Sequence, residues 1–483
     1  MIGILYMGDN MLKKTKIVCT IGPSTDDENI MRELMKNGMD VARFNFSHSD
    51  HSVHKARFET VCKLREELGV NIATLLDTKG PEVRLKNFKD HKPVTIKDGD
   101  TFTLTTREVE GDETICSITF PQLPKDVSVG TRILINDGNI ELKALRVDNT
   151  DIVCEVIHGG VVSDHKGINV PDVNLSMPYI SDADMADLEF GAKMGFDYIA
   201  ASFVRTGADV IYLRKFTQSL GWFNPRIIAK IENAQGVANI DEILDAADGI
   251  MVARGDMGVE IPFEQIPAIQ KELIRKAYNA GKNVITATQM LESMITNARP
   301  TRAEITDVAN AIYDGSSAIM LSGETAAGKY PVEAVKTMSL IAETTEKDID
   351  YISRFKKRAD ERNSSITDAI SHATVTTAHD LNAVAILTVT KGGTTARTLS
   401  KFRPNCPIIA LTTDETTYHQ LSLSWGIRAG VIEEKTNTDE LIRHALERSV
   451  ELGYLKKGDL VVITAGVPLG MSGTTNLLKV ERA

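Results

Sequence analysis

Three charged side chains stand at the ends of two consecutive apolar runs, Ile227–Asn233 and Gly249–Asp256. Lys230 and Glu232 are two residues apart on a β-branched run, so they leave one face of a predicted strand together. Asp256 ends the next run. Two carboxylates that leave room for water and substrate oxygens suit Mg²⁺, and a lysine beside that metal can stabilise charge on a transferred phosphoryl group. The alternative is a buried ion pair, although buried ionised groups are costly and tend to mark functional sites.

A second run carries polar side chains along one face only. Arg43, Asn45 and Ser47 alternate with apolar neighbours, whereas a strand buried on both faces is normally apolar throughout. Asp77 and Thr78 end the run that follows. Together with Asn45 and Ser47 they offer only oxygens and a single carboxylate. We interpret this set as better suited to a monovalent cation than to Mg²⁺.

Further side chains could bind an anionic substrate or move its proton. Arg43 and Arg84 could clamp a phosphate bidentately, although a structural salt bridge is the alternative for Arg43. The sequence Arg254–Gly258 is interpreted as a turn in which Gly255 lets the main chain approach a carboxylate closely. Thr288 ends another run, where its hydroxyl could donate or relay a proton, but threonine is also an ordinary strand former.

The spacing of the runs indicates the element that must position these side chains. Eight short apolar runs end in polar residues, and six of the seven intervals between successive ends span 25 to 34 residues. The runs are Lys16–Thr20, Val41–Asn45, Ile72–Asp77, Tyr198–Ser202, Ile227–Lys230, Ile250–Asp256, Val284–Thr288 and Ala318–Ser322. Eight βα units predict a (β/α)₈ TIM barrel, whose active site lies at the carboxyl ends of its strands.

The remaining interval, 125 residues from Asp77 to Ser202, predicts a domain inserted after the third strand. Its alternating runs and Asp-Gly turns are typical of an all-β module, which we expect to act as a lid over the barrel. We expect the barrel to comprise 13–81 and 173–345, the insert 82–172, and an open α/β domain 346–483. A polar linker is expected within 344–365, and 1–12 are expected to be an N-terminal tail.

Composition excludes several classes of protein. The 483 residues carry a net charge of −11 and no basic stripe, which argues against nucleic-acid binding. The five cysteines are well separated and form no Cys-x-x-Cys, which fits a reducing compartment. No apolar run reaches membrane-spanning length and the N-terminus does not read as a signal peptide, so we expect a cytoplasmic protein.

Several uncommon stretches together resemble the pyruvate kinase family, from about Lys14 to Val480. They are Thr20–Pro23, Ala42–His48, Leu76–Arg84, Lys230–Asn233, Met251–Asp256, Ala287–Met294, Arg299–Glu304 and Met320–Thr325. The resemblance is to the bacterial type without an extra C-terminal phosphotransfer-like domain. It implies transfer of the phosphoryl group of phosphoenolpyruvate to ADP, giving ATP and pyruvate, the last step of glycolysis.

The resemblance also implies roles for individual residues. Glu232 and Asp256 would hold Mg²⁺ (or Mn²⁺), and Lys230 and Arg43 would stabilise the phosphoryl group in flight. Thr288 would sit by the enolate carbon, with a water that it orients as a candidate proton donor. The substrate-binding set would be Arg43, Lys230, Gly255, Asp256 and Thr288; the nucleotide-binding set Asn45, His48 and Arg84; and the K⁺ set Asn45, Ser47, Asp77 and Thr78. Family members with a glutamate at the place of Glu82 are typically K⁺-dependent, so we expect K⁺ activation.

The loop Thr390, Lys391, Gly392, Gly393, Thr394 and Thr395 precedes a predicted helix and resembles the family's sugar-phosphate effector loop. A plain βα turn is the alternative, and fructose 1,6-bisphosphate, ribose 5-phosphate and AMP all remain open as effectors. The family is generally tetrameric, so we expect a homotetramer. Two other functions stay open: a Mg²⁺-dependent lyase or aldolase of pyruvate-like acids, and a sugar-phosphate sensor on an inactive barrel.

Overall fold

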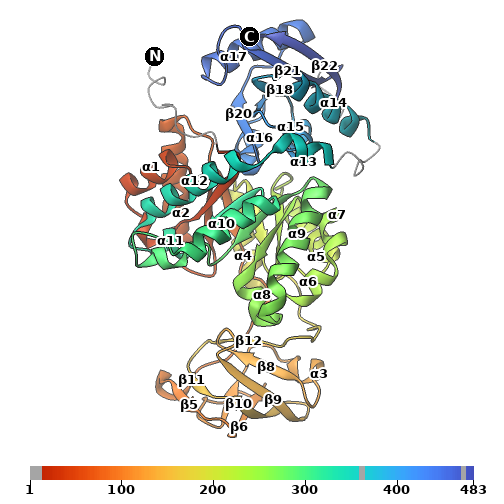
Figure 1. The fold of residues 1–483 in the computed structure, drawn as a ribbon. Helices are drawn as coiled ribbons and strands as arrows, with labels where there is room; N and C mark the ends of the chain where they lie inside the picture. The colour runs from red at the N-terminus through yellow and green to blue at the C-terminus, as the bar shows by residue number, and fades with distance from the viewer. Residues whose placement is uncertain (1–12, 358–364, 469–474) are drawn as a thin grey trace.

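A closed barrel of eight parallel strands forms the centre of the computed structural model, which describes residues 13–357, 365–468 and 475–483 (Figure 1). The expected tail 1–12 and residues 358–364 of the stretch expected to hold the linker lie outside these residues. Around the barrel the strand order is β1-β17-β16-β15-β14-β13-β3-β2. The strands are β1 Lys16–Thr20, β2 Val41–Asn45, β3 Ala73–Asp77, β13 Tyr198–Ala201, β14 Arg226–Ile231, β15 Gly249–Ala253, β16 Asn283–Ala287 and β17 Ala318–Leu321.

The expected TIM barrel is therefore confirmed, and two of the differences at strand ends affect the site. The sixth run was expected to continue to Asp256, whereas β15 ends at Ala253 and the short helix α8, Arg254–Glu260, begins directly. The seventh was expected to end at Thr288, whereas β16 ends at Ala287 and Thr288 has a φ of +67°. A left-handed residue cannot continue a strand, and in a β-branched residue this conformation is a genuine outlier.

Helices surround the barrel and cover the outward faces of its strands (Figure 1). They are α1 Glu28–Lys36, α2 His51–Leu68, α4 Asp182–Met194, α5 Gly207–Ser219, α6 Ala234–Ala238, α7 Ile240–Ala246, α9 Ile266–Ala280, α10 Arg302–Asp314, α11 Gly323–Ala326 and α12 Pro331–Asp348. Gly195 and Gly281 end α4 and α9 in the left-handed conformation that glycine adopts readily. The expected barrel limit at residue 345 falls within α12.

The insert after β3 is a separate, mostly β unit at the carboxyl end of the barrel (Figure 1). It contains β4 Val83–Arg84, β5 Val94–Ile96, β6 Thr101–Thr105, β7 Ile115–Ser117, β8 Arg132–Ile135, β9 Ile140–Val147, β10 Asp151–His158, β11 Gly160–Val162 and β12 Gly167–Asn169. Seven strands form one sheet, while β5 and β11 pair separately. One short helix, α3 Leu123–Asp126, departs from the all-β expectation.

The C-terminal domain packs against the opposite end of the barrel (Figure 1). Its sheet has the order β20-β19-β18-β21-β22, with β22 antiparallel at one edge. The elements are α13 Tyr351–Lys357, α14 Ile366–Asp380, β18 Ala385–Val389, α15 Thr394–Lys401, β19 Ile408–Thr412, α16 Glu415–Gln420, β20 Ile427–Val431, α17 Thr438–Glu451, β21 Leu460–Gly466 and β22 Thr475–Arg482. Thr394 and Thr395, expected in a loop, belong to α15.

This domain also closes the floor of the barrel. Leu423, in the 3-10 turn Leu421–Leu423, is fully buried and joins the cluster of side chains that fills the barrel interior. The Tyr198 hydroxyl at the start of β13 donates to the Gln420 carbonyl, and Arg226 at the start of β14 donates to the Gln420 side chain at 3.2 Å. The barrel core is thus completed by a residue from outside the barrel.

No helix among the described residues is both long and apolar enough to cross a membrane.

Candidate active site

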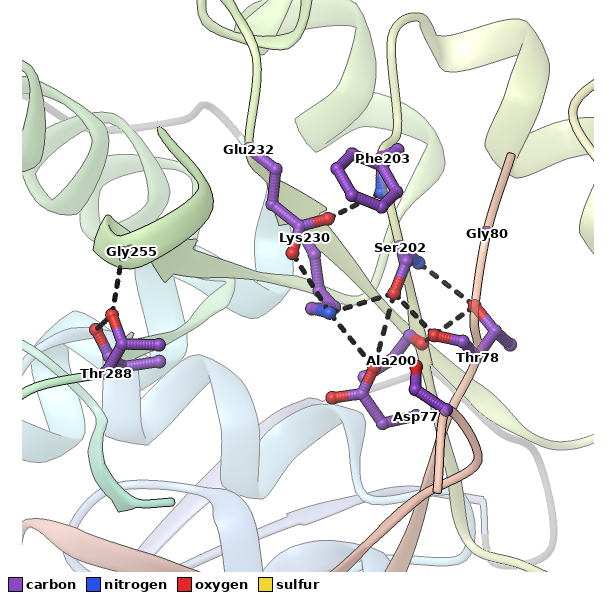
Figure 2. A network of polar contacts seen from close by, with 12 residues as sticks. Asp77, Thr78, Gly80, Ala200, Ser202, Phe203, Lys230, Glu232, Gly255 and Thr288 are labelled. Atoms are coloured by element: carbon purple, nitrogen blue, oxygen red, sulfur yellow. Dashed lines mark hydrogen bonds and ion pairs between the residues drawn. The ribbon is translucent and has the colours of Figure 1, made fainter. Parts of the chain in front are cut away.

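Lys230 lies at the centre of a buried group of charges at the carboxyl ends of β3 and β14 (Figure 2). Its ammonium nitrogen is 3.0 Å from Glu232 Oε1 and 3.1 Å from Asp77 Oδ1. Burial alone would lower the pKa of Lys230, but these two carboxylates outweigh burial and raise it. The lysine therefore carries a fixed positive charge in a low-dielectric site, where it acts strongly on any charge that develops nearby.

Two consecutive residues after β13 hold this group in place, and sequence reasoning assigned neither of them to the site. The Ser202 hydroxyl accepts a hydrogen bond from Lys230 at 2.8 Å and donates to the Thr78 carbonyl at 2.6 Å. The Phe203 amide donates to Glu232 Oε2 at 2.6 Å (Figure 2). Phe203 has a φ of +52°, a strained conformation that aims this amide at the carboxylate. Ser202 ends one of the eight apolar runs, so its position at a strand end could have indicated that it belongs to the site.

Arg43 is bound to protein groups rather than free at the mouth. Its Nε donates to Asp77 Oδ2 at 2.6 Å and its Nη1 to Thr20 Oγ1 at 2.8 Å. Burial alone would raise the pKa of Asp77, but Arg43 and Lys230 lower it below its usual value. The salt bridge that was one alternative for Arg43 is present. The guanidinium nevertheless borders the same carboxylate as Lys230, so Asp77 holds both cations.

The four residues of the expected monovalent-cation set lie next to one another. Asn45 of β2 is the register partner of Asp77 of β3, and Thr78 follows directly. The Ser47 amide donates to Asn45 Oδ1 at 3.1 Å, and the Ser202 amide donates to Thr78 Oγ1 at 3.1 Å. Asp77 is the only carboxylate among the four. These neutral oxygens and the single carboxylate fit K⁺ chemically.

Glu232 and Asp256 fit a divalent cation for a different reason. Glu232 is completely buried, and its Oε1 accepts no hydrogen bond from the described residues although it lies beside Lys230. Burial raises the pKa of Glu232, Lys230 opposes this, and the negative charge of Asp256 raises it further. Asp256 itself is exposed, in the first turn of α8. A buried carboxylate oxygen near a second carboxylate is the chemistry that Mg²⁺ would satisfy.

Thr288 and Gly255 form a second polar group across the mouth from Lys230 (Figure 2). The Gly255 amide donates to Thr288 Oγ1 at 2.9 Å, so this amide, expected to meet a substrate carboxylate, is engaged with protein here. Arg254 donates to the Thr288 carbonyl at 2.5 Å and to both oxygens of Asp307 at 2.8 and 2.7 Å. Arg254 thereby clamps the strained turn at Thr288 to α10. Sequence reasoning missed this role, because Asp307 is more than fifty residues away in the chain.

Arg84, His48 and the loop Thr390–Thr395 form no side-chain hydrogen bond or ion pair with Lys230, Glu232 or Asp77 among the described residues. Arg84 of β4 pairs with Glu82, with Nε 2.7 Å from Oε2, and donates to the His165 carbonyl within the insert. His48 is exposed after β2, and its carbonyl accepts a hydrogen bond from His54. The loop Thr390–Thr395 lies at the far end of the barrel, where the Gly392 carbonyl accepts a hydrogen bond from Arg226 at 3.3 Å.

The chain is thus a (β/α)₈ barrel protein with a β domain inserted after its third strand and a lysine held among carboxylates at the carboxyl end of the barrel. Family models for the barrel domain and the alpha/beta domain of pyruvate kinase match residues 12–335 and 368–481. The chain belongs to the pyruvate kinase family.

Individual pyruvate kinases are similar to this chain over nearly its whole length. The chain is 47% identical over 471 residues to a pyruvate kinase of Clostridium acetobutylicum, covering 97% of this chain and 99% of the relative. It is 50% identical over 473 residues to one of Geobacillus stearothermophilus, covering 98% and 80%. A crystal structure of a pyruvate kinase from Cryptosporidium parvum superposes with a TM-score of 0.91 at 39% identity, covering 97% of this chain and 96% of that one.

Proposed function

We propose that this protein transfers the phosphoryl group of phosphoenolpyruvate to ADP, forming ATP and pyruvate. The observation that carries the proposal is the position of Lys230, buried between Asp77 and Glu232 at the carboxyl end of a barrel of this family. In the reaction, the bond between phosphorus and the enol oxygen breaks. A new bond forms between phosphorus and a β-phosphate oxygen of ADP, and the enolate carbon then takes a proton.

Lys230 and Arg43 would stabilise the negative charge on the phosphoryl group during transfer, because both are cations fixed in a dry site. Their present bonds to Asp77 pre-organise them, so little reorganisation is needed when substrate binds. Thr288 would face the other side of the substrate, with its hydroxyl positioned by Gly255 and its backbone by Arg254. There it would orient the water that protonates the enolate carbon.

Glu232 and Asp256 would hold Mg²⁺ or Mn²⁺, which supplies further positive charge beside the substrate oxygens. Asn45, Ser47, Asp77 and Thr78 would hold K⁺, as expected for a chain with Glu82. Asn45, His48 and Arg84 would contact the nucleotide. Because Arg84 belongs to the insert, its contact would require the insert to approach the barrel mouth.

We also propose the domain limits, the effector site, the cellular location and the oligomeric state that the resemblance to this family implies. The chain would divide into a barrel (13–81 and 173–345), an inserted domain (82–172) and a C-terminal domain (346–483), with 1–12 as a tail. The loop Thr390–Thr395 would bind a sugar phosphate or AMP as effector. The protein would act in the cytoplasm as a homotetramer, in the EC class 2.7.1.40.

The decisive experiment measures pyruvate formation from phosphoenolpyruvate and ADP with Mg²⁺, in the presence and absence of K⁺. Turnover that rises strongly with K⁺ supports both the reaction and the K⁺ set. Turnover that does not respond to K⁺ keeps the reaction but removes that set. Folded protein that gives no turnover in either condition would overturn the proposal and return the lyase and sensor functions to consideration; neither is favoured by the relatives.

A further inference from the structure

A small cavity lies between the floor of the barrel and the C-terminal domain, far from the group around Lys230. Both domains contribute to its walls. The barrel supplies the turns that precede β16 and β17, and the C-terminal domain supplies α15. The polar lining residues that matter here are Lys282, Ser317, Arg397, Ser400, Lys401 and Arg403.

The charge of this lining is strongly positive. Lys401 is offset by Asp368, at 3.2 Å, but Lys282 and Arg397 form no ion pair with a carboxylate among the described residues. Their hydrogen bonds go to neutral groups: Lys282 donates to the Ala247 carbonyl at 2.7 Å, and Arg397 donates to the Gly392 carbonyl. Two cations therefore line one cavity without an ion-pair partner among the described residues.

Asp248, the barrel carboxylate that acts most strongly on both cations, already pairs with other residues. Asp248 accepts from Arg226 at 2.8 Å and from Arg214 at 2.9 Å, so two arginines share its charge. Burial lowers the pKa of Lys282 despite Asp248, and burial together with Arg226 lowers the pKa of Arg397 to about 10. Buried charges are normally paired, so this excess of cations calls for an anion.

Arg397 supplies the second, independent observation. Its Nη1 atom is buried and has no hydrogen-bond partner among the described residues. An orphaned buried donor is costly, and each one requires an explanation such as a bound ion or ligand. The guanidinium also packs closely against Gly393, where an added Cβ would lie 2.5 Å from Nη1. The arginine is thus held between the loop and the cavity.

We propose that this cavity binds a compact oxyanion through Arg397 and Lys282. The ligand would be inorganic phosphate or sulfate, or the phosphoryl group of a small metabolite whose remainder stays in solvent. The site is distinct from the expected effector loop, since none of Thr390–Thr395 lines the cavity. Because its walls come from both domains, a bound anion would hold the C-terminal domain against the barrel floor.

The test compares the thermal unfolding midpoint and the heat of binding of the full chain in inorganic phosphate with those in chloride at equal ionic strength. We expect a saturable rise of the midpoint with phosphate. Arg397→Met should raise the dissociation constant of phosphate at least about tenfold, because it removes hydrogen bonds to a charged group. Its midpoint without phosphate should not fall, since an uncompensated buried cation is removed.

Three further variants keep the result interpretable. Lys282→Met should weaken phosphate binding as well. Arg397→Lys keeps the positive charge and serves if Arg397→Met fails to fold; it should bind phosphate more weakly than wild type. Lys391→Met, at an exposed lysine of the expected effector loop, should weaken only phosphate bound at that loop and leave the binding at the cavity unchanged. Binding lost in Lys391→Met but unchanged in Arg397→Met and Lys282→Met would overturn the proposal, as would no saturable response to phosphate in the wild type.

A competition experiment distinguishes the sources of the anion. A sugar phosphate that displaces inorganic phosphate, and whose binding is weakened by Arg397→Met and not by Lys391→Met, would identify the phosphoryl group of a metabolite as the ligand. Displacement by sulfate alone would identify a free inorganic anion. Binding of every anion, chloride included, with equal affinity would contradict an oxyanion site.

Discussion

The ammonium group of Lys230 donates a hydrogen bond to the Ser202 hydroxyl at 2.8 Å, and that hydroxyl donates to the Thr78 carbonyl at 2.6 Å. One serine therefore joins the proposed catalytic lysine to a member of the proposed K⁺ set (Figure 2). The Phe203 amide next to it holds Glu232, a proposed Mg²⁺ ligand. The cation sites and the lysine are consequently linked through two residues of a single turn.

Replacing Lys230 tests the centre of this arrangement. Lys230→Met should lower kcat for pyruvate formation by at least ~10², the usual scale for removal of a pre-organised electrostatic donor. Circular dichroism should show a folded protein. Lys63→Met is the matched control, because Lys63 is an exposed lysine on α2 that pairs with Glu28 at the surface. Turnover of Lys230→Met close to that of Lys63→Met would remove Lys230 from the proposed catalytic group.

Ser202→Ala tests whether the serine positions the lysine. Hydrogen bonds to charged groups contribute roughly 1.5–3 kcal/mol, so kcat should fall by about 10-fold to 100-fold. The concentration of K⁺ that gives half-maximal activity should also rise, because Ser202 bonds both Thr78 and Lys230. A purely structural role for Ser202 would lower stability and leave the K⁺ dependence unchanged.

The control for this variant is Ser219→Ala, at the exposed end of α5, where the Phe216 carbonyl is the one partner of the hydroxyl among the described residues. It should leave both kcat and the K⁺ dependence as in wild type. A Ser202→Ala enzyme with wild-type kcat and wild-type K⁺ dependence would show that Lys230 needs no hydroxyl to hold it.

Much of the fold follows from local patterns. The apolar runs and their even spacing predicted the barrel, the insert and the C-terminal domain, because each pattern reflects burial of a strand. The runs also predicted that Lys230 and Glu232 lie together, since they share one face of β14. The positions of the strands and the pairing of Lys230 with Glu232 both follow from spacing along the chain alone.

The remaining features depend on contacts between distant segments. Arg254 and Asp307 meet only because α10 packs beside the carboxyl end of the barrel, so neither residue alone predicts their ion pair. The strained backbone at Thr288 lies beside those contacts, whereas β propensity predicted a strand residue there. Leu423 likewise gives no local signal that it completes a barrel core formed by strands hundreds of residues earlier.

Leu423→Ala should therefore destabilise the barrel although Leu423 lies outside it. Truncation of a fully buried leucine typically costs about 2–5 kcal/mol, and here it would open a cavity under the barrel core. Urea unfolding should show a lower midpoint for the barrel transition. Leu340→Ala is the control, because Leu340 is 64% exposed on α12 and its truncation should change stability by no more than about 0.5 kcal/mol. Equal midpoints for the two variants would show that the C-terminal domain does not support the barrel.

Asp248 should make the junction of the two domains acid-sensitive. Burial alone would raise its pKa, but Arg226 and Arg214 lower it from 3.8 to about 2. A lowered carboxylate pKa stabilises the folded protein at every pH above the unfolded value, and this stability is lost as pH falls from about 4 to 2. The shift corresponds to roughly 2 kcal/mol. Chemical unfolding at pH 7 and at pH 3 should show a smaller acid-induced loss for Asp248→Asn than for wild type or for Asp241→Asn, whose carboxylate is exposed on α7. An identical loss in all three proteins would assign the acid sensitivity to other groups.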